Sequence, residues 1–240
     1  EMTTKYTCFK FKQFNVQQSN AAMKIGTDGI LLGALANVAL AKRALDIGTG
    51  TGVIALMQTQ KNSTVNVDAI EVDSTACIDA EQNFTKSPWK NRLHLFHSAL
   101  ENFNPAYKYD TIISNPPFFE NSILSKSKKR TLARHSASLH YSQVLSFAKN
   151  QLTPEGNICL ILPFSEEEKC IKIATDLGFF MNRICNVFPK KNKKQHRTLF
   201  EFSSLPNNLV NETLVIEKEE RHNYTEEYRS LTNDFYIIFD

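Results

Sequence analysis

The chain of 240 residues lacks the features that mark several large classes of protein. Its five cysteines are scattered and form no Cys-x-x-Cys pair. We therefore expect neither a zinc site nor a disulfide framework, and we predict that the protein works in a reducing cytoplasm. No apolar run is long enough to cross a bilayer, and no charged-then-apolar leader is visible, so membrane insertion and export are not expected. There are no internal repeats.

A strong excess of one charge is also missing, because the net charge is only +3. The distribution of charge is more informative. Residues 121–139 contain cations but no acid, and a second basic cluster follows Pro189. One such run is usually a solvated loop, whereas two favour contact with a polyanion. The residues predicted to bind nucleic acid are Lys126, Lys128, Lys129, Arg130 and Arg134 in the first cluster and Lys190, Lys191, Lys193 and Lys194 in the second.

The most informative motif is Asn115-Pro116-Pro117-Phe118, which follows the apolar run 109–114. The run is typical of a buried parallel strand, and the prolines end it because they cannot continue the hydrogen-bond ladder. Open α/β sheets bind ligands at the carboxyl ends of their strands. An amide oxygen and a free carbonyl there can accept both protons of a planar NH2 group, and a ring can stack on the base that carries it. A lone Asn-Pro-Pro can equally be a structural turn.

A glycine-rich loop, residues 48–52, lies upstream between an expected strand, 43–47, and an expected helix. Alternate glycines let the backbone turn sharply and let a ligand approach main-chain N–H groups. The dinucleotide fingerprint Gly-x-Gly-x-x-Gly fails from the first glycine, because Val53 occupies the third glycine position. Asp46, at the strand tip, would repel a pyrophosphate and attract a cationic ligand. The loop therefore favours S-adenosylmethionine, which carries an ammonium and a sulfonium.

A third element of the pattern is Glu71, near the end of an expected strand over 65–72 and nineteen residues after Gly52. An acid at this distance is placed to accept hydrogen bonds from the ribose hydroxyls of a nucleoside ligand. The glycine loop, this acid and the later Asn-Pro-Pro-aromatic motif occur in the order found in class I S-adenosylmethionine-dependent methyltransferases. The chain resembles that class.

The order of the expected elements predicts the fold. Strands and helices alternate, which gives a mostly parallel sheet with helices on both faces. The last two strands have no helix between them, so we expect an antiparallel hairpin at the sheet edge. The predicted fold is α/β, a Rossmann-like class I methyltransferase fold with a seven-stranded sheet. Strands are expected near 43–47, 65–72, 92–97, 109–114, 156–162, 179–188 and 197–203, and helices near 52–61, 74–86, 138–152 and 165–177.

We predict one domain over the whole chain, made of three parts. Residues 1–41 would form an N-terminal arm and helix, 42–203 the catalytic core, and 204–240 a C-terminal extension. Within the extension, 213–218 is a further strand candidate, and the aromatic segment 228–239 would pack on the sheet or contact a partner.

The amino-terminal segment narrows the resemblance. Residues 9–16 alternate apolar and polar side chains, as a half-buried strand does. A loop and a helix capped by Thr27 or Asp28 are expected to follow. Two segments precede the glycine loop: Lys-Gln-Phe at 12–14 and residues 22–33. With them, the chain resembles one narrower family, the bacterial tRNA1(Val) (adenine-37-N6)-methyltransferases. The resemblance runs from about residue 9 to residue 189, and includes Arg134-His135 and Leu152-Thr153-Pro154-Glu155-Gly156.

This resemblance implies a cofactor, a substrate and a set of roles. S-adenosylmethionine would be the cofactor and tRNA the substrate, and the target adenine would stack on Phe118 while Asn115 and the Pro116 carbonyl hold its amine, with Pro117 completing the turn. Many methyltransferases place an aspartate after the strand near 92–97, where this chain has Ser98, and family members often have tyrosine in place of Phe118. The residues expected to contact the cofactor are Thr27, Asp28, Asp46, Gly48, Gly50, Gly52, Glu71, Val72, Ser98 and Ala99.

Several other functions remain open from the sequence. A methyltransferase acting on guanine N2 or on another adenine of RNA or DNA would share every cofactor residue. A protein glutamine methyltransferase also uses an Asn-Pro-Pro-aromatic turn, but the two basic clusters argue against it. The third possibility is a nucleic-acid-binding module with a vestigial cofactor fold, which the intact Asp46, Glu71 and Asn115 oppose. We expect no metal and assume a monomer.

Overall fold

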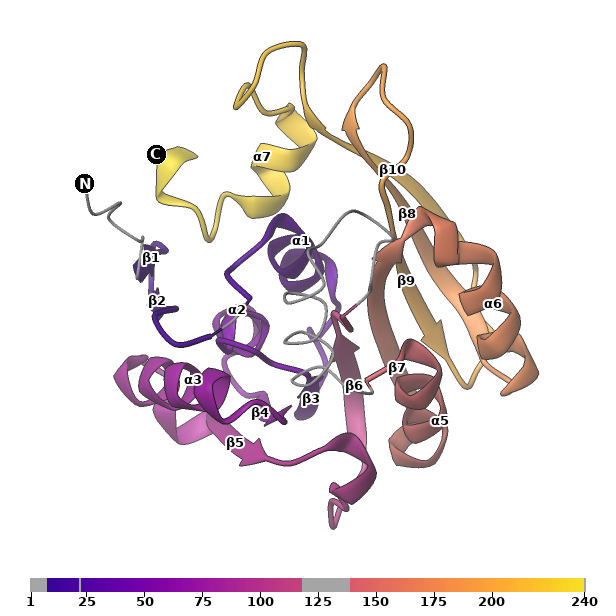
Figure 1. Cartoon of the computed structure of the whole chain (residues 1–240). Coiled ribbons are helices and arrows are strands. Elements are labelled where there is room, and N and C mark those ends of the chain that lie inside the picture. Colours follow the sequence, from indigo (N-terminus) through magenta and orange to yellow (C-terminus); the bar gives the residue numbers. More distant parts are fainter. Residues whose placement is uncertain (1–7, 22, 118–138, 240) are drawn as a thin grey trace, which may run out of the picture.

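A computed structural model describes residues 8–21, 23–117 and 139–239. Its centre is an eight-stranded sheet in the order β10-β8-β9-β7-β6-β3-β4-β5 (Figure 1). The five strands from β7 to β5 run parallel to one another. β9 lies antiparallel between β7 and β8, and β10 pairs in parallel with β8. The bounds are β3 Arg43–Ile47, β4 Asn66–Glu71, β5 Leu93–His97, β6 Tyr109–Ser114, β7 Leu152–Pro163, β8 Phe180–Lys190, β9 Arg197–Ser203 and β10 Val210–Glu217.

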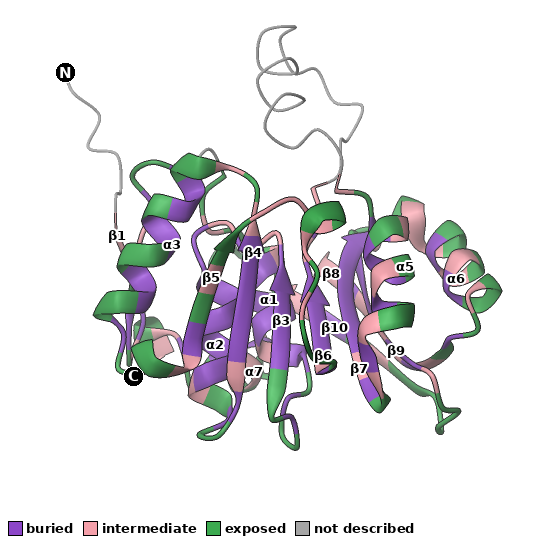
Figure 2. Ribbon diagram, turned by 90° about the horizontal axis from the view of Figure 1, so that it is seen from below, coloured by how far each residue is buried: buried purple, intermediate pink, exposed green. Residues whose placement is uncertain are grey.

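The central strands are apolar along their length because both faces of the sheet are covered. Successive side chains point to opposite faces, so Leu45 and Ile112 join one core while their neighbours Ala44 and Ile113 join the other. Figure 2 shows the buried residues concentrated in these strands and the exposed ones on the outer sides of the helices.

Helices cover the two faces of the sheet in two groups (Figure 1). One core contains residues of α1 (Thr27–Leu35), α2 (Val53–Lys61), α3 (Ser74–Lys86) and α7 (Glu226–Thr232). The other contains residues of α5 (Tyr141–Gln151) and α6 (Glu167–Asp176). Asp73 caps α3 by accepting from the backbone N–H groups of Thr75 and Ala76. Short 3₁₀ turns lie at η1 Lys90–Arg92, η2 Leu100–Asn102, η3 Phe164–Glu166 and η4 Ile237–Phe239.

The predicted α/β fold, a mostly parallel sheet with an antiparallel hairpin and helices on both faces, is confirmed, and two details differ. The antiparallel hairpin of β8 and β9 exists, but it lies inside the sheet. The free side of β8 is covered by an eighth strand, β10, whose Leu214 is buried in the core. β10 contains most of the strand candidate at 213–218 and begins three residues earlier. The edge of a sheet presents unpaired N–H and C=O groups that a further strand can bind. β10 binds those of β8 while Leu214 packs in the core.

The single strand expected over 9–16 is also wrong. The segment is a hairpin of β1 (Cys8–Lys10) and β2 (Asn15–Gln17), in which Phe11 and Phe14 stack with ring centroids 4.5 Å apart. Both rings are buried, and the chain turns between them. Tyr236 of the C-terminal segment forms an isolated bridge to Phe11, so the N-terminal hairpin packs against this segment. No helix in the described ranges has the length and apolar character needed to cross a membrane.

Candidate functional site

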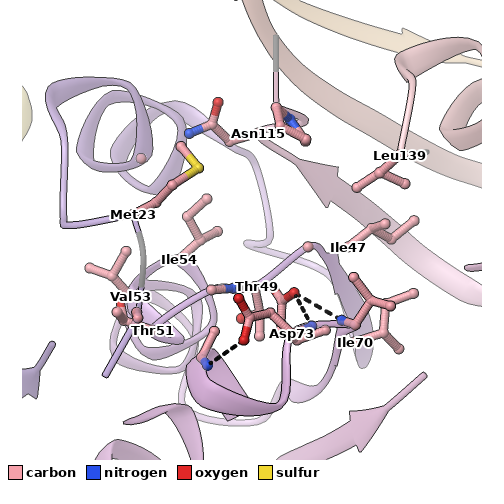
Figure 3. A pocket seen from close by; sticks show the side chains of 18 of the residues that line it. Met23, Ile47, Thr49, Thr51, Val53, Ile54, Ile70, Asp73, Asn115 and Leu139 are labelled. Atoms are coloured by element: carbon pink, nitrogen blue, oxygen red, sulfur yellow. Dashed lines mark hydrogen bonds between the residues drawn. The ribbon is translucent and has the colours of Figure 1, made fainter. Parts of the chain in front are cut away.

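A cavity of about 330 Å³ lies at the carboxyl ends of β3, β4, β5 and β6 (Figure 3). Four segments supply most of its walls: the glycine loop, the end of β4 with the start of α3, residues 98–101 after β5, and the arm residues that precede α1. Asn115 just after β6 and Leu139 and Gln143 near the start of α5 also belong to the described lining.

The glycine loop has the backbone conformation that its sequence predicts. Gly48, Gly50 and Gly52 have φ angles of 72°, 57° and 83°, in the left-handed region that favours glycine. A Cβ on Gly52 would lie 2.4 Å from a ring carbon of Phe84. Gly48 and Gly50 line the cavity, whereas Gly52 serves as the N-cap of α2.

Glu71 connects the loop to the end of β4. Its Oε2 accepts from the Gly50 N–H at 2.8 Å, and its Oε1 accepts from the N–H groups of Val72 and Asp73 at 2.8 and 2.9 Å. Glu71 also lines the cavity. Each carboxylate oxygen has two lone pairs, so Oε1 is fully used by its two N–H donors, whereas Oε2 can accept one further hydrogen bond. The predicted contact with a ribose stays a prediction.

Asp46 lies behind the loop, 1% exposed, and is not among the lining residues. Its Oδ2 accepts from the Thr49 hydroxyl at 2.6 Å, and Thr49 does line the cavity. Burial raises the pKa of Asp46 to about 7, against the lowering effect of hydrogen bonds from Thr49 and from the Ala55 backbone. Asp46 therefore faces the cavity through Thr49, and its predicted attraction for an ammonium stays a prediction.

Asn115 is brought to the cavity by its neighbour in the strand. The Ser114 hydroxyl donates to the Ile47 carbonyl at 2.8 Å, which joins the tips of β6 and β3. Figure 3 shows the Asn115 amide at the cavity beside Met23. Pro117 also lines the cavity, whereas Pro116 is buried and does not. Phe118 lies outside the described residues.

Two predicted residues are placed differently. The expected side-chain cap by Thr27 or Asp28 is wrong, because Gly26 is the N-cap of α1 and no side chain caps it. Gly26 and Gly29 line the cavity, but Thr27 and Asp28 do not. Asp28 instead pairs with Arg197, whose Nε lies 2.8 Å from its Oδ2 and whose side chain is 10% exposed. A cation so deeply placed needs a carboxylate partner.

The predicted adenine end agrees better with the lining. Val72, Ser98 and Ala99 all contribute to the wall. The Ser98 hydroxyl donates to the Ala99 carbonyl at 2.9 Å, so its proton is already used. Lining residues that the sequence analysis missed include Met23, Lys24, Asp73, Glu101, Leu139 and Gln143.

The described lining fits a cationic nucleoside better than a phosphate. It contains three carboxylates, Glu71, Asp73 and Glu101, and one cation, Lys24. The Lys24 ammonium donates to the carbonyls of Ala21, at 2.9 Å, and Gln18. Carboxylates would repel a pyrophosphate and attract an ammonium or sulfonium. The charges of the described lining therefore fit S-adenosylmethionine.

The two basic clusters differ in what is known of them. The first, at 126–134, lies outside the described residues. The second forms the turn between β8 and β9, at the carboxyl edge of the sheet, because Arg197 pairs with Pro163 at the end of β7. The Lys190 ammonium donates to the Glu219 carbonyl at 2.8 Å. The side chains of Lys191, Lys193 and Lys194 are exposed.

Comparisons with known proteins agree with this geometry. The family model described as "Methyltransferase small domain" matches residues 11–172. A Parabacteroides distasonis protein named tRNA1(Val) (adenine(37)-N6)-methyltransferase is 42% identical over 231 residues, covering 95% of this chain and 97% of its own. A Flavobacterium psychrophilum protein of the same name is 40% identical over 232 residues, covering 95% and 99%. A crystal structure of a predicted O-methyltransferase from Agrobacterium tumefaciens shares the fold, with a TM-score of 0.67 at 16% identity over 87% of this chain and 96% of that one.

Proposed function

Because the chain belongs to the methyltransferase small domain family, and within it to the tRNA1(Val) (adenine(37)-N6)-methyltransferases, we propose that it methylates N6 of adenine 37 in tRNA1(Val) with S-adenosylmethionine. The observation that carries this proposal is the position of Asn115. Its amide lies on the wall of the cavity that the glycine loop and Glu71 also line. A group that can hold an amine is thus beside a site that fits a methyl donor.

The chain's residues act on the amine mainly by orientation. The exocyclic amine of adenine is a poor nucleophile, because its lone pair is delocalised into the ring. Asn115 would accept from one N–H, and the Pro116 carbonyl is the predicted acceptor for the other. Acceptors off the ring plane favour a more tetrahedral nitrogen aimed at the donor. When bound, S-adenosylmethionine would supply a methyl group on a sulfonium, and the amine would release one of its two protons to solvent as it becomes a methylamine.

The remaining roles follow from the walls of the cavity. Main-chain N–H groups at Gly48 and Thr49 already bond to Ile70 O, at 2.9 and 3.0 Å, which fixes the loop against β4 before any ligand arrives. Glu71 would accept one hydrogen bond from the ribose with the remaining lone pair of Oε2. Asp46 would orient the Thr49 hydroxyl and, in its ionised form, add negative charge behind it.

The substrate would be held outside this cavity by cations at the same edge of the sheet. Lys191, Lys193 and Lys194 are exposed there and would bind the tRNA backbone. The target base must leave its stack to reach Asn115, as in other enzymes that act on a base. Phe118 remains the predicted stacking partner, and cytoplasmic action as a monomer remains the expectation.

Nucleoside analysis tests the proposal. An unmodified tRNA1(Val) transcript would be incubated with the protein and S-adenosylmethionine, digested and measured by mass spectrometry. We expect N6-methyladenosine, and none of it from a transcript that carries guanine at position 37. Methylguanosine, or N6-methyladenosine that persists in the control transcript, would instead indicate a methyltransferase that acts on guanine N2 or on another adenine.

A further inference from the structure

We infer that Asp79 and Asn83, two buried polar residues of α3, are positioning residues for the cofactor. They do not line the cavity. They hold the arm segment, defined here as residues 17–21 and 23–26, against the glycine loop. The inference rests on the proposed function in one respect, the identity of the ligand as S-adenosylmethionine.

The arm segment forms one side of the cavity. Ala21, Met23, Lys24, Ile25 and Gly26 all belong to the lining. Figure 3 places Met23 opposite the residues that follow β4 and next to Asn115. The segment is neither helix nor sheet after β2, so its backbone position depends on the side chains that bond to it.

Asp79 supplies one of these attachments. The residue is 1% exposed. Its Oδ2 accepts from the backbone N–H groups of Asn20 and Ala21, at 2.9 and 2.8 Å, and its Oδ1 accepts from the Asn20 side-chain amide at 2.8 Å. Hydrogen bonds to an ionised carboxylate are stronger than neutral ones. The carboxylate therefore fixes the arm at Ala21, which is itself a lining residue.

Asn83, one helical turn further along α3, supplies the second attachment. It is 2% exposed. Its amide exchanges two hydrogen bonds with the Gln17 backbone, accepting at 2.7 Å and donating at 2.9 Å, as a neighbouring strand would. The same Nδ2 donates to the Thr51 carbonyl at 2.9 Å. Thr51 is part of the glycine loop and lines the cavity, so one side chain joins two of its walls.

The arm transmits this attachment to the rest of the lining. The Ile25 N–H donates to the Gln18 side-chain carbonyl at 2.9 Å, and the Lys24 ammonium donates to the Ala21 carbonyl at 2.9 Å. Residues 24 and 25 are therefore tied to residues 18 and 21. A shift of the arm at Gln17 or Ala21 moves the wall that a bound cofactor would touch.

This arrangement predicts an effect on affinity more than on the transfer step. An arm that has lost its attachments must be ordered again when the cofactor binds, and that cost weakens binding. Asp79 and Asn83 touch neither the cavity nor Asn115, so a loaded site would react at a nearly normal rate. A rise in KM with kcat preserved is the signature of lost binding that is uniform through the reaction.

The experiment compares Asn83→Ala and Asp79→Ala with the wild type and with Gln82→Ala, an exposed position on the same helix. Titration calorimetry with S-adenosylmethionine alone gives Kd, and tRNA methylation at saturating cofactor gives kcat. We expect Kd to rise roughly tenfold in each of the two variants, which corresponds to about 1.4 kcal/mol. Gln82→Ala should match the wild type, and kcat should change less than about threefold in all.

A conservative variant tests whether the hydrogen bonds of Asp79 hold the arm. In Asp79→Asn the amide oxygen can still accept from the backbone N–H groups of Asn20 and Ala21, and the Asn20 side chain can turn its oxygen to accept from the new Nδ2. We expect Asp79→Asn to recover most of the affinity that Asp79→Ala loses. Variants that melt at lower temperature but bind with unchanged Kd well below that temperature would overturn the inference. So would an Asp79→Asn variant that binds no better than Asp79→Ala. A wild-type protein that does not bind S-adenosylmethionine would instead refute the proposed function.

Discussion

The parallel strands of the sheet end at one side of the molecule, called here the carboxyl edge, and begin at the other, the amino edge. Both edges carry charged side chains around a hollow, and they differ in how those side chains are used. At the carboxyl edge, the cavity of about 330 Å³ is walled by the glycine loop, Glu71 and Asn115. At the amino edge, a wider hollow of about 710 Å³ is lined by Lys61, Arg183 and residues near them. Size alone would select the second hollow as the binding site.

The charges of the amino edge are already used within the protein. Arg183 pairs with Glu212, with Nε 2.7 Å from its Oε2, and donates to the Leu35 carbonyl at 3.1 Å. The Lys61 ammonium donates to the carbonyls of Gly33 and Ala34, at 3.3 and 2.7 Å. The last carbonyls of a helix have no partner within it, and here two cations supply one for α1. Burial lowers the pKa of Lys61 to about 8.

The carboxyl edge has the opposite character. Gly48 and Gly50 have backbone conformations in the left-handed region, and both line the cavity. Asn115 comes directly after β6, and its amide lies at the cavity. The comparison teaches that a charged cluster whose bonds close on the protein is structural, whereas a polar group aimed into a cavity is a candidate for function.

The largest effect that would break this comparison is expected at Asn115. Asn115→Ala removes a preorganised acceptor and should lower kcat for tRNA methylation by ~10²–10³. The affinity for S-adenosylmethionine, measured by calorimetry, should stay within about threefold of the wild type. If affinity and kcat fell together, Asn115 would be structural, and the two edges would no longer differ in kind.

A smaller effect of another sort is expected at the amino edge. Arg183→Met leaves Glu212 and the Leu35 carbonyl without their donor, so the free energy of unfolding in urea should fall by roughly 1–3 kcal/mol. The kcat measured well below the melting temperature should be unchanged. Lys172→Ala is the control, because its ion pair with Asp176 is exposed, with side chains 76% and 63% accessible, and should contribute less than about 1 kcal/mol. A loss of kcat in Arg183→Met without a loss of stability would contradict the structural role.

Local patterns in the sequence predicted much of the fold. The bounds of β3, α3, β6 and β9 agree with the expected ranges, because each has its own pattern of apolar residues or its own cap, as Asp73 is for α3. The N-terminal hairpin and β10 were mispredicted or only partly predicted. Their form depends on distant partners, such as Tyr236 for Phe11 and Arg183 for Val210, that no local pattern reveals.

The same division holds in the site. Gly48, Gly50, Glu71 and Asn115 line one cavity, because each motif fixes its own backbone and the parallel sheet brings the strand ends together, and their contacts with ligands stay predictions. Asp28 is not in the described lining and pairs with Arg197, a partner 169 residues away in sequence that the local pattern could not indicate. Asp79 and Asn83 carried no signal for a similar reason, because their partners lie on an arm 58 to 66 residues earlier.

The smallest effect is expected in the turn between β8 and β9. It tests whether the carboxyl edge also binds tRNA at a distance from the cavity. Replacing Lys191, Lys193 and Lys194 by glutamine removes three exposed charges from the carboxyl edge. If each meets a single-stranded phosphate, the slope of log K against log salt for tRNA binding should shrink by about 0.7 per contact. Calorimetry with the cofactor should show no change, because none of the three lines the cavity.

A matched charge loss at the opposite edge makes this test specific. Lys42, Lys90 and Lys108 are exposed and stand just before β3, β5 and β6, at the amino ends of the strands. Replacing them by glutamine removes the same net charge but should leave the salt slope nearly unchanged, since direct phosphate contacts, and not the overall field, set that slope. Equal slopes for the two triple variants would mean that tRNA responds to the charge of the whole protein. The carboxyl edge would then hold the cofactor without also being the surface that binds the nucleic acid.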